Sequence, residues 1–229
     1  MGRGLHRDRP FRRIEPQIGP AEVADVRELL GETFGGVVGS DRFSAYSFLP
    51  NRWRQVCWGH LKREFQAFVD RGGPSALLGE ALLEQVEIMF GWWYRVRDGT
   101  LKRSTFQVYM SSVRGRVNEL LRQGEKCAHS KTASTCSEIM KVEPALWTFV
   151  RKEGVEPTNN AAERALRHGV LWRKSSFGTQ SEAGSRFVER MMTVVTTLRQ
   201  QKRNVLDYLT AACEAHLRGE IPPSLLQTI

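Results

Sequence analysis

This sequence contains no long apolar run and no leader pattern. The apolar stretch at 191–198 lies between Arg190 and Arg199 and is far shorter than a bilayer span. The N-terminal residues MGRGLHRDRPFRR are charged and have no apolar segment behind them, which excludes a signal peptide. We therefore expect no membrane partner and a cytoplasmic location.

Cysteine is scarce, and acidic residues are outnumbered by basic ones. The four cysteines (Cys57, Cys127, Cys136 and Cys213) are irregularly spaced, which favours a reducing compartment over a disulfide scaffold. Lys and Arg number 34 against 25 Asp and Glu, so the net charge is +9 and a polyanion is the expected partner. An apolar content of 41% excludes a mostly disordered chain.

The first third of the chain mixes helices and short strands. Apolar spacing predicts helices at 21–30 and 60–69. Segment 34–41 is short and apolar except for two polar residues at its end. This pattern predicts a buried strand with Asp41 at its C-terminal tip. Residues 55–58 predict a second short strand.

The rest of the chain is predicted to be helical. Between 77 and 122, apolar residues at helical spacing predict two amphipathic helices with a turn at Asp98-Gly99. The small polar segment 124–137 predicts a loop, and 143–151 a short helix. Further helices are expected from Ala161 onward and at 188–198 and 205–217, with ordered structure ending at Pro222-Pro223.

Two carboxylates occupy positions that could carry chemistry. Asp41 lies where a buried strand ends, the edge at which open α/β sheets bind ligands, although a turn-initiating Asp is an equally good interpretation. Glu163 follows Asn160 by three residues, which is also the pattern of a helix capping box. Carboxylate oxygens suit Mg²⁺, but 122 residues separate these two, so only the fold could bring them together.

A Cys-x-x-His segment, Cys57 to His60, is at most half of a zinc site. Cys127, His129 and Cys136 could complete it. The alternative, which we favour, is a buried cysteine and a first-turn histidine.

Basic and aromatic residues alternate at 52–58 and 92–97, a pattern that suits phosphates and exposed bases. At least one of Trp92 and Trp93 is expected to pack in the core instead. A third basic run at 171–178 follows Glu163 and includes Arg173 and Lys174, which are candidate phosphate contacts together with Ser175 and Ser176.

Several of these segments together resemble the transposases of the bacterial insertion sequence 66 family. The matching segments are GGVVGSDRFSAY at 35–46, CWGHLKREF at 57–65, TNNAAERALR at 158–167, WRK at 172–174 and the tail LRGEIPPSLL at 217–226. Their order and spacing also match, over roughly residues 11–226.

The resemblance implies an α/β, RNase-H-like core with a DDE triad that binds two Mg²⁺ (or Mn²⁺) ions and acts on DNA at the ends of a mobile element. By match, Asp41 is the second acidic residue and Glu163 the third, both as metal ligands. Arg164, Arg167, Arg173 and Lys174 are then expected DNA contacts near Glu163, in a bacterial, nucleoid-associated protein.

The resemblance also implies a domain order, which we expect to be predominantly helical overall. The expected parts are a basic arm at 1–13, a partial core at 14–75, a helical insertion at 76–152, the C-terminal core helices at 153–218 and a tail at 219–229. The first Asp of the triad has no match, since Asp8 lies in the arginine-rich arm. We therefore expect a C-terminal catalytic-domain fragment that is inactive alone.

Two other functions fit the same sequence. The chain could be a non-catalytic fragment that binds DNA, pairs with itself or partners an intact transposase. It could also be an unrelated helical nucleic-acid-binding protein.

Overall fold

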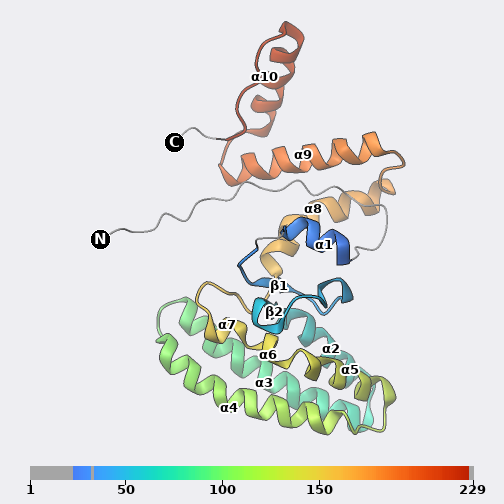
Figure 1. Ribbon diagram of the computed structural model, residues 1–229, viewed down its shortest axis with the longest axis vertical. Helices are drawn as coiled ribbons and strands as arrows, with labels where there is room; N and C mark the ends of the chain where they lie inside the picture. The colour runs from blue at the N-terminus through green and yellow to red at the C-terminus, as the bar shows by residue number, and fades with distance from the viewer. Residues whose placement is uncertain (1–22, 32–33, 227–229) are drawn as a thin grey trace. The chain divides into compact units, whose positions relative to one another are not determined.

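The computed structural model describes residues 23–31 and 34–226, which fall in two compact units (Figure 1). The first unit comprises the described residues up to Ala161, and the second begins at Ala162. The predicted basic arm at 1–13 and the beginning of the predicted helix at 21–30 lie outside the described residues. Within the described ranges, no helix combines the length and apolarity that a bilayer span requires.

The first unit is mostly helical and contains one pair of short parallel strands. Its elements are α1 (Val23–Leu30), β1 (Val38–Ser40), η1 (Ser44–Tyr46), η2 (Asn51–Trp53), β2 (Arg54–Val56), α2 (Trp58–Asp70), α3 (Gly73–Arg97), α4 (Arg103–Gly124), α5 (Ser130–Lys141), α6 (Glu143–Leu146) and α7 (Thr148–Arg151). In β1 and β2, Val38 pairs with Arg54 and Ser40 with Val56. Both predicted strands are present. The strand predicted at 34–41 is shorter and only Ser40 in it is buried, whereas the strand predicted at 55–58 lies earlier and is buried throughout.

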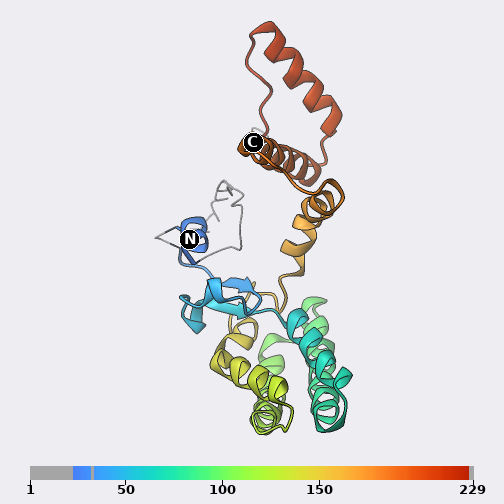
Figure 2. The same ribbon diagram turned by 90° about the vertical axis from the view of Figure 1, so that its right-hand side faces the viewer.

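The helices α2 to α5 lie on one side of this strand pair and enclose the hydrophobic core (Figure 2). Side chains from α2 (Leu61, Phe65 and Phe68) meet side chains from α3 and α4 in a single cluster. The two long helices predicted between 77 and 122 are confirmed as α3 and α4. Their apolar residues recur at helical spacing, so burial against neighbouring helices stabilises each along its whole length.

Helices α2 and α3 approach each other at Gly79. A Cβ atom on this residue would lie 2.7 Å from the Phe65 carbonyl oxygen and 2.8 Å from the Val69 nitrogen. Only a residue without a side chain allows this backbone contact.

The predicted loop at 124–137 is wrong, because most of it belongs to α5. Thr132, Cys136 and Ile139 lie on one face of α5 and are completely buried. The Thr132 hydroxyl contacts Ser75 Oγ at 2.7 Å and accepts a hydrogen bond from Arg71 at 2.8 Å. Small polar residues of low helix propensity form this helix because the neighbouring helices bury the face that carries Thr132, Cys136 and Ile139. Composition alone does not predict such burial.

Helices α6 and α7, together the predicted short helix at 143–151, dock onto β2 through buried polar groups. The Gln55 amide donates to the Leu146 carbonyl (3.1 Å) and accepts from the Phe149 N–H (2.7 Å). The Thr148 hydroxyl donates to the Arg54 carbonyl at 2.6 Å. These bonds satisfy backbone groups that would otherwise be buried without partners.

The second unit consists of α8 (Asn160–Ser176, which begins at the end of the first unit), α9 (Glu182–Gln200) and α10 (Val205–Arg218). The predicted helices at 161 onward, 188–198 and 205–217 are therefore confirmed. Gly219 ends α10 in the left-handed region (φ 72°). The chain stays ordered beyond the predicted end at Pro222-Pro223, since Tyr208 donates to the Pro223 carbonyl at 3.1 Å and Arg203 to the Leu225 carbonyl at 3.1 Å.

The four thiols differ sharply in exposure. We expect the most exposed thiol of the native chain to be alkylated first and the buried thiols last. Cys213 is exposed, Cys127 is intermediate, and Cys57 and Cys136 are buried. Burial, with the neighbouring Cys127 and Glu125, raises the pKa of Cys136 to about 12, so its reactive thiolate is absent at neutral pH.

Peptide mapping by mass spectrometry after iodoacetamide treatment should find Cys213 modified first. Cys57 and Cys136 should react only after denaturation, which is also the control that all four thiols can be detected. Labelling of Cys136 as fast as that of Cys213 would contradict the packing of α5.

Candidate active site

The carboxyl end of the parallel strand pair places Asp41 where the sequence predicts it. Asp41 follows the last residue of β1, and the Cys57 N–H, directly after β2, donates to the Ser40 carbonyl at 2.8 Å. The Asp41 Oδ1 accepts a hydrogen bond from the Phe43 N–H at 3.0 Å, which closes a turn after the strand. Asp41 therefore both begins a turn and lies at the end of a strand, so both interpretations of its sequence position are correct.

Arg54 is a buried cation beside Asp41. Its side chain is only 4% exposed and donates from Nη2 to the Asp41 carbonyl at 3.4 Å. Burial lowers the pKa of Arg54, and the charges of Asp41 and Tyr46 oppose that change. Burial and then the Asp41 charge raise the pKa of Tyr46. The basic and aromatic pattern at 52–58 predicts a nucleic-acid surface that includes Arg54, and this prediction is wrong for Arg54, which is buried next to Asp41.

Two segments of the sequence that lie a hundred residues apart meet at this edge. The Trp58 N–H donates to the Pro157 carbonyl at 2.9 Å. A Cβ atom on Gly59 would lie 3.3 Å from Asn160 Oδ1 and 3.9 Å from Thr158 Cγ2. Residues 57–59 and 157–160 are therefore in direct contact, both next to the end of the strand pair.

Asn159, which precedes Asn160 in the chain, has a side-chain oxygen without a hydrogen-bond partner in the described part of the chain. Its Oδ1 is buried, and none of the described residues donates a hydrogen bond to it. A buried amide oxygen without a partner is available to a ligand, a water molecule or a cation. The only sequence signal for this residue is the pair of asparagines before Glu163, which is unusually polar for a helix start.

Helix α8 carries the other predicted site residues. It begins at Asn160, so Glu163 lies in its first turn, as predicted. Arg164 and Arg167 are exposed, and Arg173 and Lys174 lie in the last turn and are also exposed. Ser175 and Ser176 donate their hydroxyls to carbonyls of the same helix, at 3.0 Å and 2.8 Å from the Trp172 oxygen. The approach of Glu163 to Asp41 stays a prediction.

Zinc ligands do not assemble around Cys57 and His60. Among the described residues, no three His, Cys, Asp or Glu side chains are arranged to hold a metal ion. Cys57 and Cys136 are buried, and His129 precedes the first turn of α5.

The basic–aromatic segments are divided between core and surface. Trp58 is fully buried, donates to the Leu146 carbonyl at 2.8 Å and packs edge-on against Trp147. Trp93 is buried too, which confirms that one of the tryptophans at 92 and 93 belongs to the core. Trp92 packs on Tyr109, with the Arg95 guanidinium over its ring.

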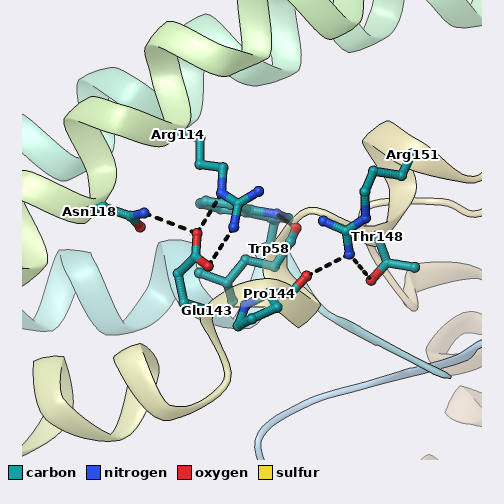
Figure 3. A network of polar contacts seen from close by, with 8 residues as sticks. Trp58, Arg114, Asn118, Glu143, Pro144, Thr148 and Arg151 are labelled. Atoms are coloured by element: carbon teal, nitrogen blue, oxygen red, sulfur yellow. Dashed lines mark hydrogen bonds and ion pairs between the residues drawn. The ribbon is translucent and has the colours of Figure 1, made fainter. Parts of the chain in front are cut away.

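An ion pair between a buried carboxylate and a partly exposed arginine joins α4 to α6, and no sequence motif indicates it (Figure 3). Arg114 Nε and Nη2 donate to the two oxygens of Glu143, both at 2.7 Å, and Asn118 donates to the same carboxylate at 3.1 Å. Glu143 is only 8% exposed. Twenty-nine residues separate the partners, so no local spacing could reveal the pair.

Comparison with known proteins gives one family. The model of the Transposase IS66 family matches residues 22–187. The uncharacterized protein y4qI of Sinorhizobium fredii (strain NBRC 101917 / NGR234) is 26% identical over 227 residues, which cover 89% of this chain and 41% of that protein. The chain thus spans about two fifths of the length of this relative. No solved structure matches the chain significantly. Since the family match covers well over half of the sequence, including the contact between residues 57–59 and 157–160, the chain belongs to the Transposase IS66 family.

Proposed function

We propose that the chain supplies two acidic residues, Asp41 and Glu163, to the Mg²⁺-dependent DNA cleavage and strand-transfer centre of a DDE transposase with an RNase-H-like core. One observation carries the proposal. Asp41 ends a parallel strand at the point where residues 57–59 meet residues 157–160, and Glu163 lies one helical turn beyond that contact.

The residues at this edge are chemically suited to a hard cation. Mg²⁺ in proteins is commonly bound by one or two carboxylates, with waters and substrate phosphates filling its other positions. Asp41 offers a carboxylate at the strand end, Glu163 would offer a second, and the unpartnered Oδ1 of Asn159, four residues before Glu163, would offer a neutral oxygen. When bound, such an ion activates a water molecule or a 3′-hydroxyl for attack on a phosphodiester and stabilises the charge that develops.

The chain's own side chains have distinct roles in this proposal. The turn that holds the Asp41 carboxylate fixes its direction, and Arg54 adds a buried positive charge behind it. The exposed Arg164, Arg167, Arg173 and Lys174 would neutralise phosphates along α8 and orient the DNA.

A metal-directed cleavage experiment tests the proposal without requiring activity. Fe²⁺ can occupy Mg²⁺ sites and, with ascorbate and peroxide, produces hydroxyl radicals that cut the backbone beside the ion. We expect cuts near Asp41 and near Glu163 in the 229-residue chain, both reduced by Mg²⁺ and both lost in Asp41→Asn and in Glu163→Gln.

Glu182→Gln is the matched control, because Glu182 is also an acidic residue in a first helical turn and pairs with Arg186. It should leave the cuts unchanged. Cuts near only one of the two carboxylates would remove the other from the proposed site.

Strand transfer by the purified chain alone is expected to be absent. Two matched carboxylates fix at most one ion loosely, since the first acidic residue of the triad that the resemblance implies has no match in this sequence. Joining of a terminal-repeat oligonucleotide by the wild type but not by Glu163→Gln would contradict this expectation.

The alternative function is a non-catalytic fragment that binds DNA or an intact transposase. The basic residues exposed along α8 would serve this function as well as they would serve catalysis. DNA binding without Fe²⁺-directed cuts at either carboxylate would select this alternative.

A further inference from the structure

A small cavity lies between α4 and the segment formed by α6 and α7. Neither Asp41 nor Glu163 lines it. Its volume is about 230 Å³, and its lining includes the polar residues Gln107, Ser111, Arg114 and Arg151. Trp147 and Val150, both nearly inaccessible, form an apolar part of the wall. Charged donors beside an apolar wall bind anions more strongly than the same donors in open water.

The cavity has more positive than negative charge. Arg114 is paired with Glu143, whereas Arg151 donates only to neutral groups, the Pro144 carbonyl at 2.9 Å and the Thr148 hydroxyl at 3.4 Å (Figure 3). In the described part of the chain, no carboxylate lies within ion-pair distance of Arg151. The one carboxylate near these two guanidinium groups is therefore paired with Arg114 alone.

The two arginines are close enough to repel each other. Burial and then the Arg114 charge lower the pKa of Arg151, and Glu143 only partly compensates. An anion in the cavity would relieve this repulsion and receive hydrogen bonds from a planar guanidinium, whose geometry suits phosphate oxygens.

The polar residues continue as a stripe along α4. Arg103, Gln107, Ser111 and Arg114 follow one another at spacings of four, four and three residues, so they share one face of the helix. The stripe is about 16 Å long at 1.5 Å per residue. Arg103 and Gln107 donate to backbone carbonyls at 149–152, so Arg114 and Arg151 are the cations that face the cavity. Lys152, whose ammonium lies 4.3 Å from the centre of the Trp53 ring, adds a further cation next to Arg151.

We propose that this face of α4, with Arg151 of α7, is a second DNA-backbone site and that the cavity binds one phosphodiester group. The site differs from the expected contacts on α8 and involves no metal. The anion site follows from the charges and the cavity, whereas DNA as the ligand rests on the proposed function.

Fluorescence anisotropy with the full chain and a labelled random-sequence duplex tests the DNA site. Arg151→Gln should weaken binding about tenfold at low salt and reduce the slope of log affinity against log salt by about one, because one phosphate contact is lost. Arg116→Gln is the matched control, since Arg116 is an exposed arginine of the same helix paired with Glu119. It should change affinity less than about twofold.

A second variant addresses a possible loss of folding in Arg151→Gln. Ser111 is exposed, so Ser111→Glu leaves the core intact and introduces a carboxylate beside Arg151. It should weaken DNA binding at least as much. Equal affinity of both variants and the wild type would overturn the DNA site.

Titration with inorganic phosphate, followed by NMR of the arginine Nε–H groups, separates a free anion from the polymer. Shifts at Arg114 and Arg151 that Ser111→Glu abolishes, together with weaker DNA binding, support the proposal. Phosphate-dependent shifts with unchanged DNA affinity would show a site for free phosphate only and overturn the DNA assignment. Neither experiment contains a divalent metal, so failure here is distinct from failure of the Fe²⁺ experiment.

Discussion

Gly79→Ala is expected to lower the free energy of unfolding by about 2 kcal/mol, because overpacking at a close backbone contact exceeds the gain in helix propensity. The new methyl group would lie within 3 Å of the Phe65 oxygen, the Val69 nitrogen and the Phe68 Cβ. Two of these atoms belong to the backbone of α2, so they cannot rotate away. Helices α2 and α3 would have to separate along a contact that the whole first unit depends on. Urea denaturation followed by circular dichroism measures the change.

Gly91→Ala is the matched control on the same helix. No atom lies within 4 Å of a Cβ at this exposed position, so the substitution should stabilise the chain by about 0.5–1 kcal/mol through helix propensity. The two variants should therefore differ by about 3 kcal/mol, with opposite signs. Equal effects at both positions would contradict the close approach of α2 and α3.

Glu143→Gln is expected to cost about 1–2 kcal/mol at neutral pH, because it removes the charge of a buried carboxylate that accepts hydrogen bonds from Arg114 and Asn118. Glu119→Gln is the control, since that glutamate forms an exposed pair with Arg116 on the same helix and should change stability by less than about 0.5 kcal/mol. Chemical denaturation of both variants and the wild type provides the comparison.

The same carboxylate should make stability depend on pH. Burial alone would raise the pKa of Glu143, but hydrogen bonds from Arg114 and Asn118 and the charge of Arg114 outweigh it and hold the pKa below its ordinary value. A carboxylate with a lowered folded-state pKa stabilises the fold above its unfolded pKa of about 4.3. This contribution is lost as the pH falls through the folded-state pKa.

The wild type should therefore lose stability relative to Glu143→Gln as the pH falls below about 4.3, and the two curves should converge in acid. Parallel curves for the two proteins over this range would show that the ion pair does not contribute to stability.

Local sequence patterns predicted the helices in which buried apolar residues recur at regular spacing. Helices α3 and α4 could be located because their apolar residues recur every three or four positions over more than twenty residues. Helix α5 could not, because its buried face consists of Thr132, Cys136 and Ile139 among small polar residues. Its stability comes from contacts with Ser75 and Arg71, which lie about sixty residues earlier in the sequence.

The candidate site divides in a similar way. The position of Asp41 at a strand end and of Glu163 in a first helical turn followed from a few neighbouring residues. The burial of Arg54 beside Asp41, the bond from Trp58 to Pro157 and the unpartnered Asn159 oxygen did not, because each depends on residues distant in the sequence.

The sequence by itself determined the positive charge, the long helices and the family, since these depend on composition, on short-range periodicity and on motifs read in order. Only the tertiary structure decided which arginines are buried, which tryptophans belong to the core and where Arg114 meets Glu143. The physical reason is that burial and ion pairing depend on which surfaces the packed helices bring together, and that packing joins residues with no local relation in the chain.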